Sequence, residues 1–590
     1  MTAWALPEQH PIPANHPIPD PAPPRNYYAA DRHLQRALAR YHRHDPAALA
    51  WAEHYLYEWG GVCAQQVAPL YEAAERNPPT LKTYDRRGER VDDITFHPAY
   101  HEIERLAYGA GIASMCNRPG FRGLPGPAAQ LDKFAAMYLF QQAEGSVGCP
   151  LSMTDILARV LNKYASPDLI ARYVPRLTRL DDQQYTGAMF LTERAGGSDL
   201  GATITTARRD GAAWRLDGDK WFCSNVGADL ILTLARPEGA PPGTRGLGLF
   251  LVPRLLSDGG RNPYLIHRLK DKLGTRAMAS GEVTFTGTMA YLIEPLERGF
   301  VMMMEMVNGT RLHSGVAGAG ALRRAVVEAT LHARERHAFG RALAEQPLVA
   351  ETLADLIADS AAATSLMLAT AHALDRADRP EAARDEAVLS RLLIALLKRY
   401  ATARGVQGAQ AAMELRGGNG YIEDWPNARL LRDAEVQVIW EGGVNMVSFD
   451  VLRAVEREDA WPVYAGAVER ELALAAAPDT ALLADALHRA LDRLNRLGER
   501  IGGWSREAKE IAAPGLAETM AALYAAALLA AEASFAFERS DDEGALALAA
   551  TRRYHDRVLG PGLDALARHA NADPRSAADT ANLIAAAVVR

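Results

Sequence analysis

The sequence predicts an α+β fold in which a strand-rich middle region separates two helical regions. From Tyr28 to about Asp182, apolar residues recur at three- and four-residue spacing, which is typical of amphipathic helices. From Gln184, short runs of β-branched and aromatic residues alternate with Gly, Pro, Asp and Asn, which indicates strands and turns. The helical spacing returns at Phe300 in long Ala- and Leu-rich stretches. Helices, strands and helices in this order are an informative arrangement in themselves.

These changes of pattern divide the chain into five segments. Residues 1–24 hold eight prolines, which favour an extended arm because proline fixes φ and lacks an N–H. This arm is either a disordered leader or a strap around a neighbouring subunit. The expected segments are a Pro-rich N-terminal arm (1–27), an N-terminal α-helical domain (28–183), a middle antiparallel β domain (184–295), a four-helix-type α domain (296–455) and an extra C-terminal helical domain (456–590).

Composition narrows the function classes. The chain has 590 residues, 48% of them hydrophobic and 23% charged, and a formal net charge of −7, whereas nucleic-acid-binding proteins are more often basic. No uncharged apolar run is long enough for a transmembrane helix, and the N-terminus lacks the pattern of a secretory signal. The four cysteines are far apart without CxxC pairing, so we expect free thiols, no metal site and a cytoplasmic location.

The first motif is a strand that runs into a loop of small and hydroxylated residues. It contains Met189, Thr192 and Ser198 within the sequence MFLTERAGGSD. Such a loop can bring backbone N–H and hydroxyl donors close to a flat heteroaromatic ring or a phosphate. By itself, the motif is equally consistent with an ordinary turn.

The second motif is the strand KWFCSN. Because alternate side chains of a strand point to the same face, Phe222 and Ser224 would present a ring and a hydroxyl together. An ordinary core strand that ends in a turn is the alternative interpretation.

Two further motifs pair basic or aromatic residues with glycines. Arg336 and Phe339 lie in RHAFG, with Gln346 shortly after, and an arginine at a helix end can bind a phosphate. Gly417 and Gly418 lie in RGGNGY, where clustered glycines can form a nest of backbone donors. A solvated arginine and a plain helix cap are the respective alternatives.

The fifth motif places a carboxylate after two bulky apolar residues. Glu441 follows Ile439 and Trp440 and precedes two glycines, with Asn445 close behind. An apolar pocket raises the pKa of a carboxyl group, and a general base works best when its pKa approaches the working pH. A surface glutamate at the end of a helix is the alternative for this motif alone.

Taken in order, the five motifs resemble those of the acyl-CoA dehydrogenase superfamily over roughly residues 50–455. LTERAGGSD is similar to the family's TExxAGSD flavin loop, and RDAEVQVIWEGGVNM is similar to the stretch that carries its catalytic glutamate. The segments TYDRRGERVDDITFHPAYHEI, GCPLSMT and IWEGGVNMVSFDVLRA resemble the AidB-like branch of alkylation-response flavoproteins. That branch also shares the N-terminal arm and an additional C-terminal helical domain.

The resemblance implies an FAD cofactor and assigns roles to individual residues. Glu441 corresponds to the catalytic base, and Arg311 is a candidate substrate contact. The alternative position of the base in some members is Thr310 here, which cannot act as a base. The implied cofactor-binding residues are Met189, Thr192, Ser198, Phe222, Ser224, Arg336, Phe339, Gln346, Gly417, Gly418 and Asn445. The chain departs from the common family pattern at Phe222, Glu414 and Gly443, which puts the substrate in doubt.

The resemblance supports two different functions. The first is α,β-dehydrogenation of an acyl-CoA thioester, for example one with a short branched chain, in a homotetramer with FAD at a subunit interface and electron-transferring flavoprotein as acceptor. The second is DNA binding that protects against alkylation. Residues 451–590 carry a net charge of −5, which argues against DNA, although Arg489, Arg493, Arg496 and Arg500 share one face of an expected helix. A flavin-bound structural protein without turnover is a third interpretation.

Overall fold

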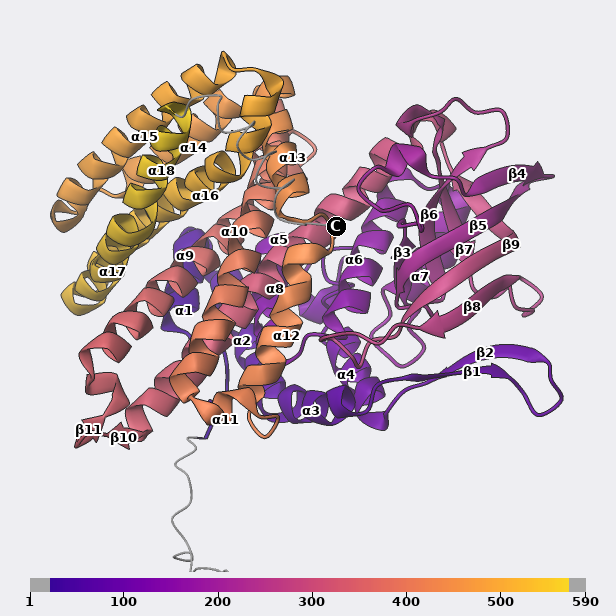
Figure 1. Cartoon of the computed structure of the whole chain (residues 1–590), viewed down its shortest axis with the longest axis horizontal. Coiled ribbons are helices and arrows are strands. Elements are labelled where there is room, and N and C mark those ends of the chain that lie inside the picture. Colours follow the sequence, from indigo (N-terminus) through magenta and orange to yellow (C-terminus); the bar gives the residue numbers. More distant parts are fainter. Residues whose placement is uncertain (1–21, 572–590) are drawn as a thin grey trace, which may run out of the picture.

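The computed structural model describes residues 22–571, and the predicted N-terminal arm therefore lies almost wholly outside the described residues. In Figure 1 the helical regions occupy the left and centre of the molecule, and the sheet lies on the right. The chain thus follows the predicted order of helices, strands and helices.

The N-terminal region is helical, with one exception. Its helices are α1 (Arg32–Tyr41), α2 (Pro46–Val62), α3 (Ala68–Arg76), α4 (Pro98–Gly109), α5 (Gln130–Ala143), α6 (Gly148–Tyr164) and α7 (Pro167–Leu177). The prediction of an all-helical region was wrong at β1 (Thr80–Tyr84) and β2 (Arg90–Thr95), which form an antiparallel hairpin. Figure 1 shows this hairpin reaching out beneath the sheet, where Arg90 donates to the Ile266 carbonyl.

The middle region is a single curled sheet. Its strands are β3 (Gly187–Phe190), β4 (Thr206–Asp210), β5 (Ala213–Ser224), β6 (Leu230–Pro237), β7 (Gly248–Pro253), β8 (Tyr264–Leu269) and β9 (Ser280–Ile293). Their order is β3-β6-β4-β5-β9-β7, with β8 on β9 and an extra pairing of β7 with β6. The sheet is largely antiparallel, but β6 pairs in parallel with β3 and β4, so the prediction of a purely antiparallel domain needs this correction.

Long helices form the third region. They are α8 (Gly299–Glu335), α9 (Pro347–Ala377), α10 (Arg384–Arg416), the short α11 (Gly418–Tyr421), α12 (Pro426–Ile439) and α13 (Val444–Arg457), with a small hairpin of β10 (His337–Ala338) and β11 (Arg341–Ala342) after α8. Helices α8 and α10 approach closely because glycines face each other: a Cβ on Gly405 would lie 2.8 Å from the Gly318 carbonyl oxygen. This crossing brings side chains of both helices to the same site.

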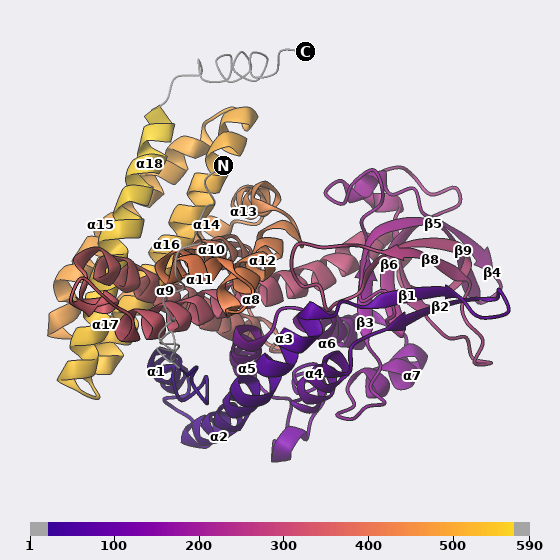
Figure 2. The same cartoon turned by 60° about the horizontal axis from the view of Figure 1, so that its bottom comes forward.

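The C-terminal region adds α14 (Ala460–Leu474), α15 (Ala481–Gly502), α16 (Arg506–Phe537), α17 (Asp541–Tyr554) and α18 (Gly560–Asn571). Figure 2 shows these helices stacked beside the central bundle, on the side away from the sheet. Helices α9 and α16 are long and apolar enough to cross a membrane by length and composition, but 78% and 89% of their apolar windows are buried inside the molecule. They are therefore accounted for as core helices of this fold.

Candidate active site

Glu441 lies in the tight connection between α12 and α13. Its φ of +56° and the φ of +97° at Gly442 both fall in the left-handed region, which residues other than glycine seldom adopt. Such strain persists only where the surroundings fix the backbone, and it is concentrated at functional sites. Two cations hold this turn: Arg311 Nε donates to the Glu441 carbonyl at 2.9 Å, and Lys398 Nζ donates to the Gly442 carbonyl at 2.8 Å.

Arg311 is held in turn from the opposite side. Its Nη1 lies 2.9 Å from Asp450 Oδ2 on α13, and Arg391 of α10 lies 2.7 Å from the other oxygen of the same carboxylate. Arg311 Nε and Nη1 are therefore engaged by Glu441, Asn308 and Asp450, whereas Nη2 makes no hydrogen bond among the described residues. Arg311 thus positions the Glu441 turn, and its predicted contact with substrate stays a prediction.

The Glu441 carboxyl is electrostatically prepared to act as a base. Burial raises its pKa above the ordinary value, while the Thr310 hydroxyl and the positive charges of Arg311 and Lys398 oppose the rise. Burial lowers the pKa of the Lys398 ammonium to about 8, although the nearby Glu441 counteracts this effect. The result is a carboxylate that is more basic than usual and has defined partners.

A small cavity of about 20 Å³ adjoins this carboxyl, between α5, α6, α8 and the end of α12. A volume of that size holds roughly one water molecule. Its walls include Glu441, Thr310 and Cys149. Burial raises the pKa of the Cys149 thiol to about 12, with the Glu441 charge as a further cause, so the thiol is neutral. The same thiol contacts Ser224, which brings β5 of the sheet to the Glu441 cavity.

The predicted flavin loop is rigidly attached to the sheet. Thr192 accepts a hydrogen bond from the Trp221 N–H at 2.8 Å, and a Cβ on Gly197 would lie 2.5 Å from Thr192 Oγ1, so only glycine fits there. The buried Glu193 binds Lys220 Nζ at 2.8 Å and accepts from the Ile204 N–H at 2.8 Å. These contacts leave the loop tip with Ser198 exposed, while Met189 packs partly buried on β3.

Phe222, Ser224 and Asn445 lie on the sheet side of the site and just beyond Glu441. The Phe222 ring is 58% exposed although it sits in the long strand β5. The Lys270 ammonium lies 4.6 Å from the centre of this ring. Ser224 is half-buried, and the exposed Asn445 lies in the first turn of α13. The face is therefore open to a planar ligand.

The remaining predicted cofactor residues lie at the other end of the bundle. Figure 1 shows α11 and the β10–β11 hairpin at its lower end. Phe339 is 98% exposed at the hairpin tip, and the Arg336 guanidinium has no partner within residues 22–571. Gln346 braces the hairpin by donating to the Ala338 carbonyl at 3.0 Å. At Gly417 and Gly418 a Cβ would meet nothing within 4 Å, and Gly417 has a φ of +69°.

The two groups of predicted residues are too far apart to share one cofactor within a chain. Thr310, which contacts the Glu441 carboxyl, and Arg336 are 26 residues apart on and at the end of the continuous helix α8. At about 1.5 Å per residue, this is a separation of roughly 39 Å. That distance is longer than a dinucleotide, so the two groups of one chain cannot hold the same cofactor molecule.

Comparison with known proteins identifies the family. Models of the acyl-CoA dehydrogenase C-terminal domain, the acyl-CoA dehydrogenase middle domain and the N-terminal domain of the adaptive response protein AidB match residues 297–455, 188–288 and 18–185. Acyl-CoA dehydrogenase family member 11 of Caenorhabditis elegans is 32% identical over 528 residues, which cover 86% of this chain and 84% of that protein. The chain belongs to the acyl-CoA dehydrogenase family.

Two further relatives refine the position within the family. The putative acyl-CoA dehydrogenase AidB of Escherichia coli (strain K12) is 33% identical over 461 residues, 76% of this chain and 80% of that protein. The crystal structure of C. elegans ACDH-11 in complex with C11-CoA superimposes with a TM-score of 0.85 at 30% identity, over 95% of this chain and 96% of that one. The predicted fold class and the predicted relation to the AidB-like branch are both confirmed.

The family consists of FAD-dependent oxidoreductases that act on CH–CH groups, and this chain fits that cofactor. Hydroxyl donors of the loop and an exposed ring at Phe222 suit a flavin, and the unpaired Arg336 with the open backbone at Gly417 suits a pyrophosphate. The residues predicted to bind FAD therefore include chemically suitable polar and aromatic groups, and their individual roles stay predictions.

Several contributors to the site escaped the sequence interpretation. Lys398 and Asp450 fix the Glu441 turn, and Cys149 and His313 line its cavity. Cys149 lies in the GCPLSMT segment, which resembles the AidB-like branch, but the sequence alone gives this cysteine no role at the site. Lys398 stands in an unbroken helical pattern, and nothing in its local sequence distinguishes it from a solvated lysine.

Proposed function

We propose that the protein is an FAD-dependent dehydrogenase that removes the α- and β-hydrogens of a short-chain acyl-CoA thioester, straight or branched, with Glu441 as general base. The observation that carries this proposal is the half-buried Glu441 carboxyl in a strained turn beside a cavity of about 20 Å³. A cavity that holds roughly one water molecule can admit the end of a short acyl group more readily than a long alkyl chain, which favours a short substrate.

Glu441 would take the α-proton of the thioester onto a carboxylate oxygen. Its raised pKa strengthens the base, and the backbone of its turn is held by Arg311 and Lys398. FAD, when bound, supplies the acceptor for the β-hydride. The Glu441 N–H has no hydrogen-bond partner among the described residues, so it is free to polarise the thioester carbonyl as negative charge develops there. A preorganised donor of this kind is worth about 2.7–4 kcal/mol.

The wide separation of the two half-sites supports a homo-oligomer, for which we propose a homotetramer. Arg336, Phe339, Gln346, Gly417 and Gly418 of one copy would hold the ADP half of the FAD whose flavin lies near Glu441 of another. Light scattering on the FAD-loaded protein measures this mass directly, and a monomer that retains FAD would refute the assignment. We also propose electron-transferring flavoprotein as the electron acceptor and the cytoplasm as the location.

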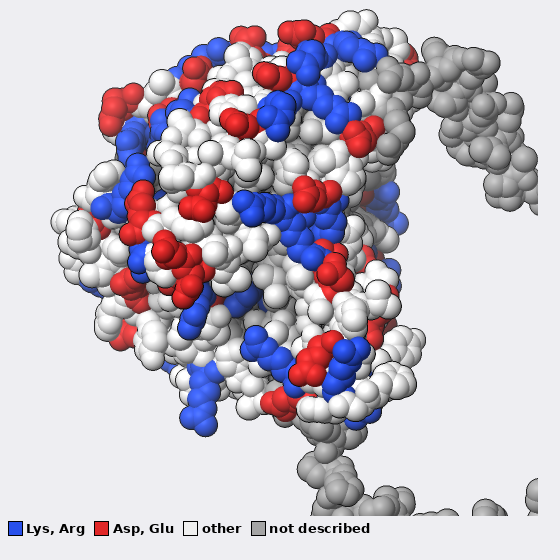
Figure 3. Space-filling model, turned by 90° about the vertical axis from the view of Figure 1, so that its left-hand side faces the viewer, with Lys and Arg blue, Asp and Glu red and all other residues white. Residues whose placement is uncertain are grey.

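DNA protection is the alternative that the AidB-like relation suggests. The four predicted arginines do lie along α15, but Arg493 is paired with Asp564 at 2.8 Å, and Asp492 and Glu499 are interspersed with them. Figure 3 shows basic and acidic side chains intermixed over the left-hand face of the molecule. A strongly salt-dependent DNA shift by the purified protein would support this alternative. We favour the dehydrogenase.

Anaerobic titration of the FAD-loaded protein with a panel of acyl-CoA thioesters tests the proposal. The panel runs from three to twelve carbons and includes isobutyryl-CoA as a branched member. We expect short acyl groups to bleach the flavin absorbance and long ones to be ineffective. If no member of the panel bleaches the flavin, the proposed dehydrogenase activity is refuted.

A further inference from the structure

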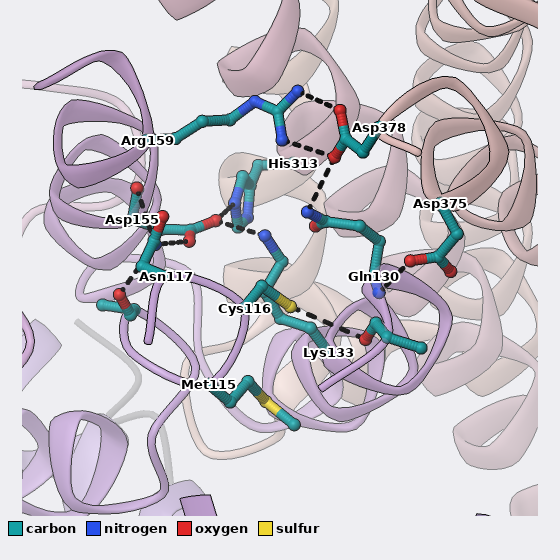
Figure 4. A network of polar contacts seen from close by, with 12 residues as sticks. Met115, Cys116, Asn117, Gln130, Lys133, Asp155, Arg159, His313, Asp375 and Asp378 are labelled. Atoms are coloured by element: carbon teal, nitrogen blue, oxygen red, sulfur yellow. Dashed lines mark hydrogen bonds and ion pairs between the residues drawn. The ribbon is translucent and has the colours of Figure 1, made fainter. Parts of the chain in front are cut away.

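A buried polar trio lies behind the Glu441 cavity. Lys133 Nζ of α5 lies 2.6 Å from Asp155 Oδ2 of α6, and His313 Nε2 of α8 lies 2.9 Å from the same oxygen. Asn117 donates to the other Asp155 oxygen at 2.9 Å. Figure 4 shows these side chains converging on Asp155 from three separate segments. His313 is 3% exposed, and its ring packs against Phe134 with centroids 4.8 Å apart.

These contacts fix the protonation state of His313. Burial alone would raise the pKa of Asp155, but Lys133 and His313 bring it down to about 2, so the carboxylate is ionised. Burial lowers the pKa of His313, although Asp155 opposes the change, so the imidazole is neutral. An ionised carboxylate can only accept, and the single ring proton therefore sits on Nε2. Nδ1 is left with a lone pair, as a hydrogen-bond acceptor.

That acceptor has no partner in the described part of the chain. His313 Nδ1 is buried and makes no hydrogen bond, while every other polar contact of the trio is satisfied around it. Leaving a buried acceptor unpaired is costly, so such an atom calls for a partner. His313 is also a wall residue of the cavity beside Glu441. The missing donor can therefore come from whatever occupies that cavity.

The rest of the wall is also more polar than an alkyl chain requires. Gln141, Ser152, Ser314 and Gln437 line the cavity beside Met137 and Met153. A second cavity of about 20 Å³ shares Gln141 and Gln437 and continues toward Arg429. Ligand pockets combine apolar walls with a few placed polar groups that set specificity. Here one of the polar groups in the wall, His313, offers an acceptor.

We propose that His313 accepts a hydrogen bond from a hydroxyl group on the acyl chain, which makes short hydroxyacyl-CoA thioesters the preferred substrates. The inference rests on the proposed function of the same site. We place the hydroxyl beyond the β-carbon, so that the α- and β-carbons that lose hydrogen both remain unsubstituted CH2 groups. 4-Hydroxybutyryl-CoA meets this requirement, and pentanoyl-CoA is its close match in size with a methyl group in place of the hydroxyl.

Binding to a variant without turnover tests the preference separately from catalysis. Glu441→Gln loaded with FAD is titrated by calorimetry with 4-hydroxybutyryl-CoA and with pentanoyl-CoA. We expect the hydroxylated thioester to bind about tenfold more tightly, because it satisfies the buried acceptor that the methyl group leaves unpaired. Equal binding, or tighter binding of pentanoyl-CoA, would overturn the inference and indicate that a buried water satisfies Nδ1.

Two further variants test whether His313 is the side chain that causes the preference for the hydroxylated thioester. His313→Leu in the Glu441→Gln background should lose the tenfold ratio, and Ser314→Ala, its neighbour in the same wall, should keep it. Each measurement compares the dissociation constants of two ligands for the same protein. A general loss of stability would affect both constants alike and leave their ratio unchanged. A ratio lost in Ser314→Ala and kept in His313→Leu would refute the role of His313.

The parent enzyme separates this inference from the proposed function. If wild-type protein shows no flavin bleaching with either thioester while Glu441→Gln still prefers the hydroxylated one, dehydrogenation is refuted and hydroxyl recognition stands. If wild-type protein bleaches with both equally well and Glu441→Gln binds both equally, dehydrogenation stands and hydroxyl recognition is refuted.

Discussion

The region around Glu441, beside Arg311 inside α8, and the region around Arg336, just past the end of α8, differ in how complete they are. Around Glu441, cations, carboxylates and backbone carbonyls are paired across α8, α10 and α13, and the base is held in a strained turn. At the other end, Phe339 is 98% exposed and Arg336 is unpaired among the described residues. Under the proposed function, one chain supplies the base, whereas the surface around Arg336 and Phe339 is left for another copy to complete.

The largest expected effect comes from breaking the interior of the catalytic half. Among residues 22–571, Asp155 is the only carboxylate that pairs with the buried Lys133, so we expect Asp155→Asn to lower the free energy of unfolding by about 3–5 kcal/mol. Denaturant unfolding of the FAD-loaded protein measures it. Asp378→Asn is the matched control, since its ion pair with Arg159 is partly exposed and should cost less than about 1 kcal/mol. Equal losses of unfolding free energy in Asp155→Asn and Asp378→Asn would contradict the contrast between a buried and a partly exposed ion pair.

The next effect concerns the turn that carries the base. Arg311→Met removes the donor to the Glu441 carbonyl, and we expect a 10- to 100-fold loss in the rate of flavin bleaching, from a charged hydrogen bond worth about 1.5–3 kcal/mol. FAD content should not change. Arg311→Lys should restore only part of the rate, because lysine cannot bind Glu441 and Asp450 with the same fork. An unchanged rate with a raised KM would instead indicate direct substrate contact.

A substitution at the exposed β10–β11 hairpin should weaken FAD binding but leave the rate of the chemical step unchanged. Phe339→Ser removes an apolar ring that a second copy would cover, and burial of such a ring is worth about 1.5–3 kcal/mol. We expect FAD to bind roughly tenfold more weakly and the bleaching rate at saturating FAD to stay the same. Leu546→Ser, which changes an exposed apolar residue on α17, is the control and should leave both FAD affinity and bleaching rate unchanged. A slower bleaching rate in Phe339→Ser would contradict the division of labour.

The smallest effect is a shift in pH dependence. The base must be deprotonated, so the rate rises as pH climbs through the pKa of Glu441, and burial places the midpoint above the ordinary 4.5. Arg311→Met removes a positive charge that lowers this pKa, so its acid limb should move to higher pH. Bleaching rates measured across acidic pH check both points. An acid limb with its midpoint below pH 4.5 in the wild type would refute the electrostatic account. So would a limb that moves to lower pH in Arg311→Met.

The sequence predicted what local pattern encodes. The order of helical and strand regions followed from periodicity, and Glu441 followed from its motif, since both are properties of contiguous residues. The β1–β2 hairpin was missed because its residues are charged and weakly buried. Parallel pairing of β6 with β3 was missed because strand alternation carries no information about direction.

Of the region around Glu441, the sequence motif pointed to Glu441 itself but not to the residues that hold its turn. The left-handed turn at Glu441 depends on Arg311 and Lys398, which come from helices far away in the sequence. For Arg311 the sequence suggested a substrate contact, which stays a prediction, but it did not reveal the hydrogen bonds to Glu441 and Asp450. The acceptor on His313 depends on Asp155, 158 residues earlier in the chain. Contacts of this kind arise from tertiary packing and not from local pattern.

The most direct test of the central claim is single-turnover flavin bleaching by wild-type protein and Glu441→Gln under anaerobic conditions with a short acyl-CoA. The account predicts that both proteins hold FAD in full and that the substitution slows bleaching by about 10²–10⁴-fold, the usual contribution of a positioned general base. Bleaching at the wild-type rate by Glu441→Gln would contradict the assignment of the base.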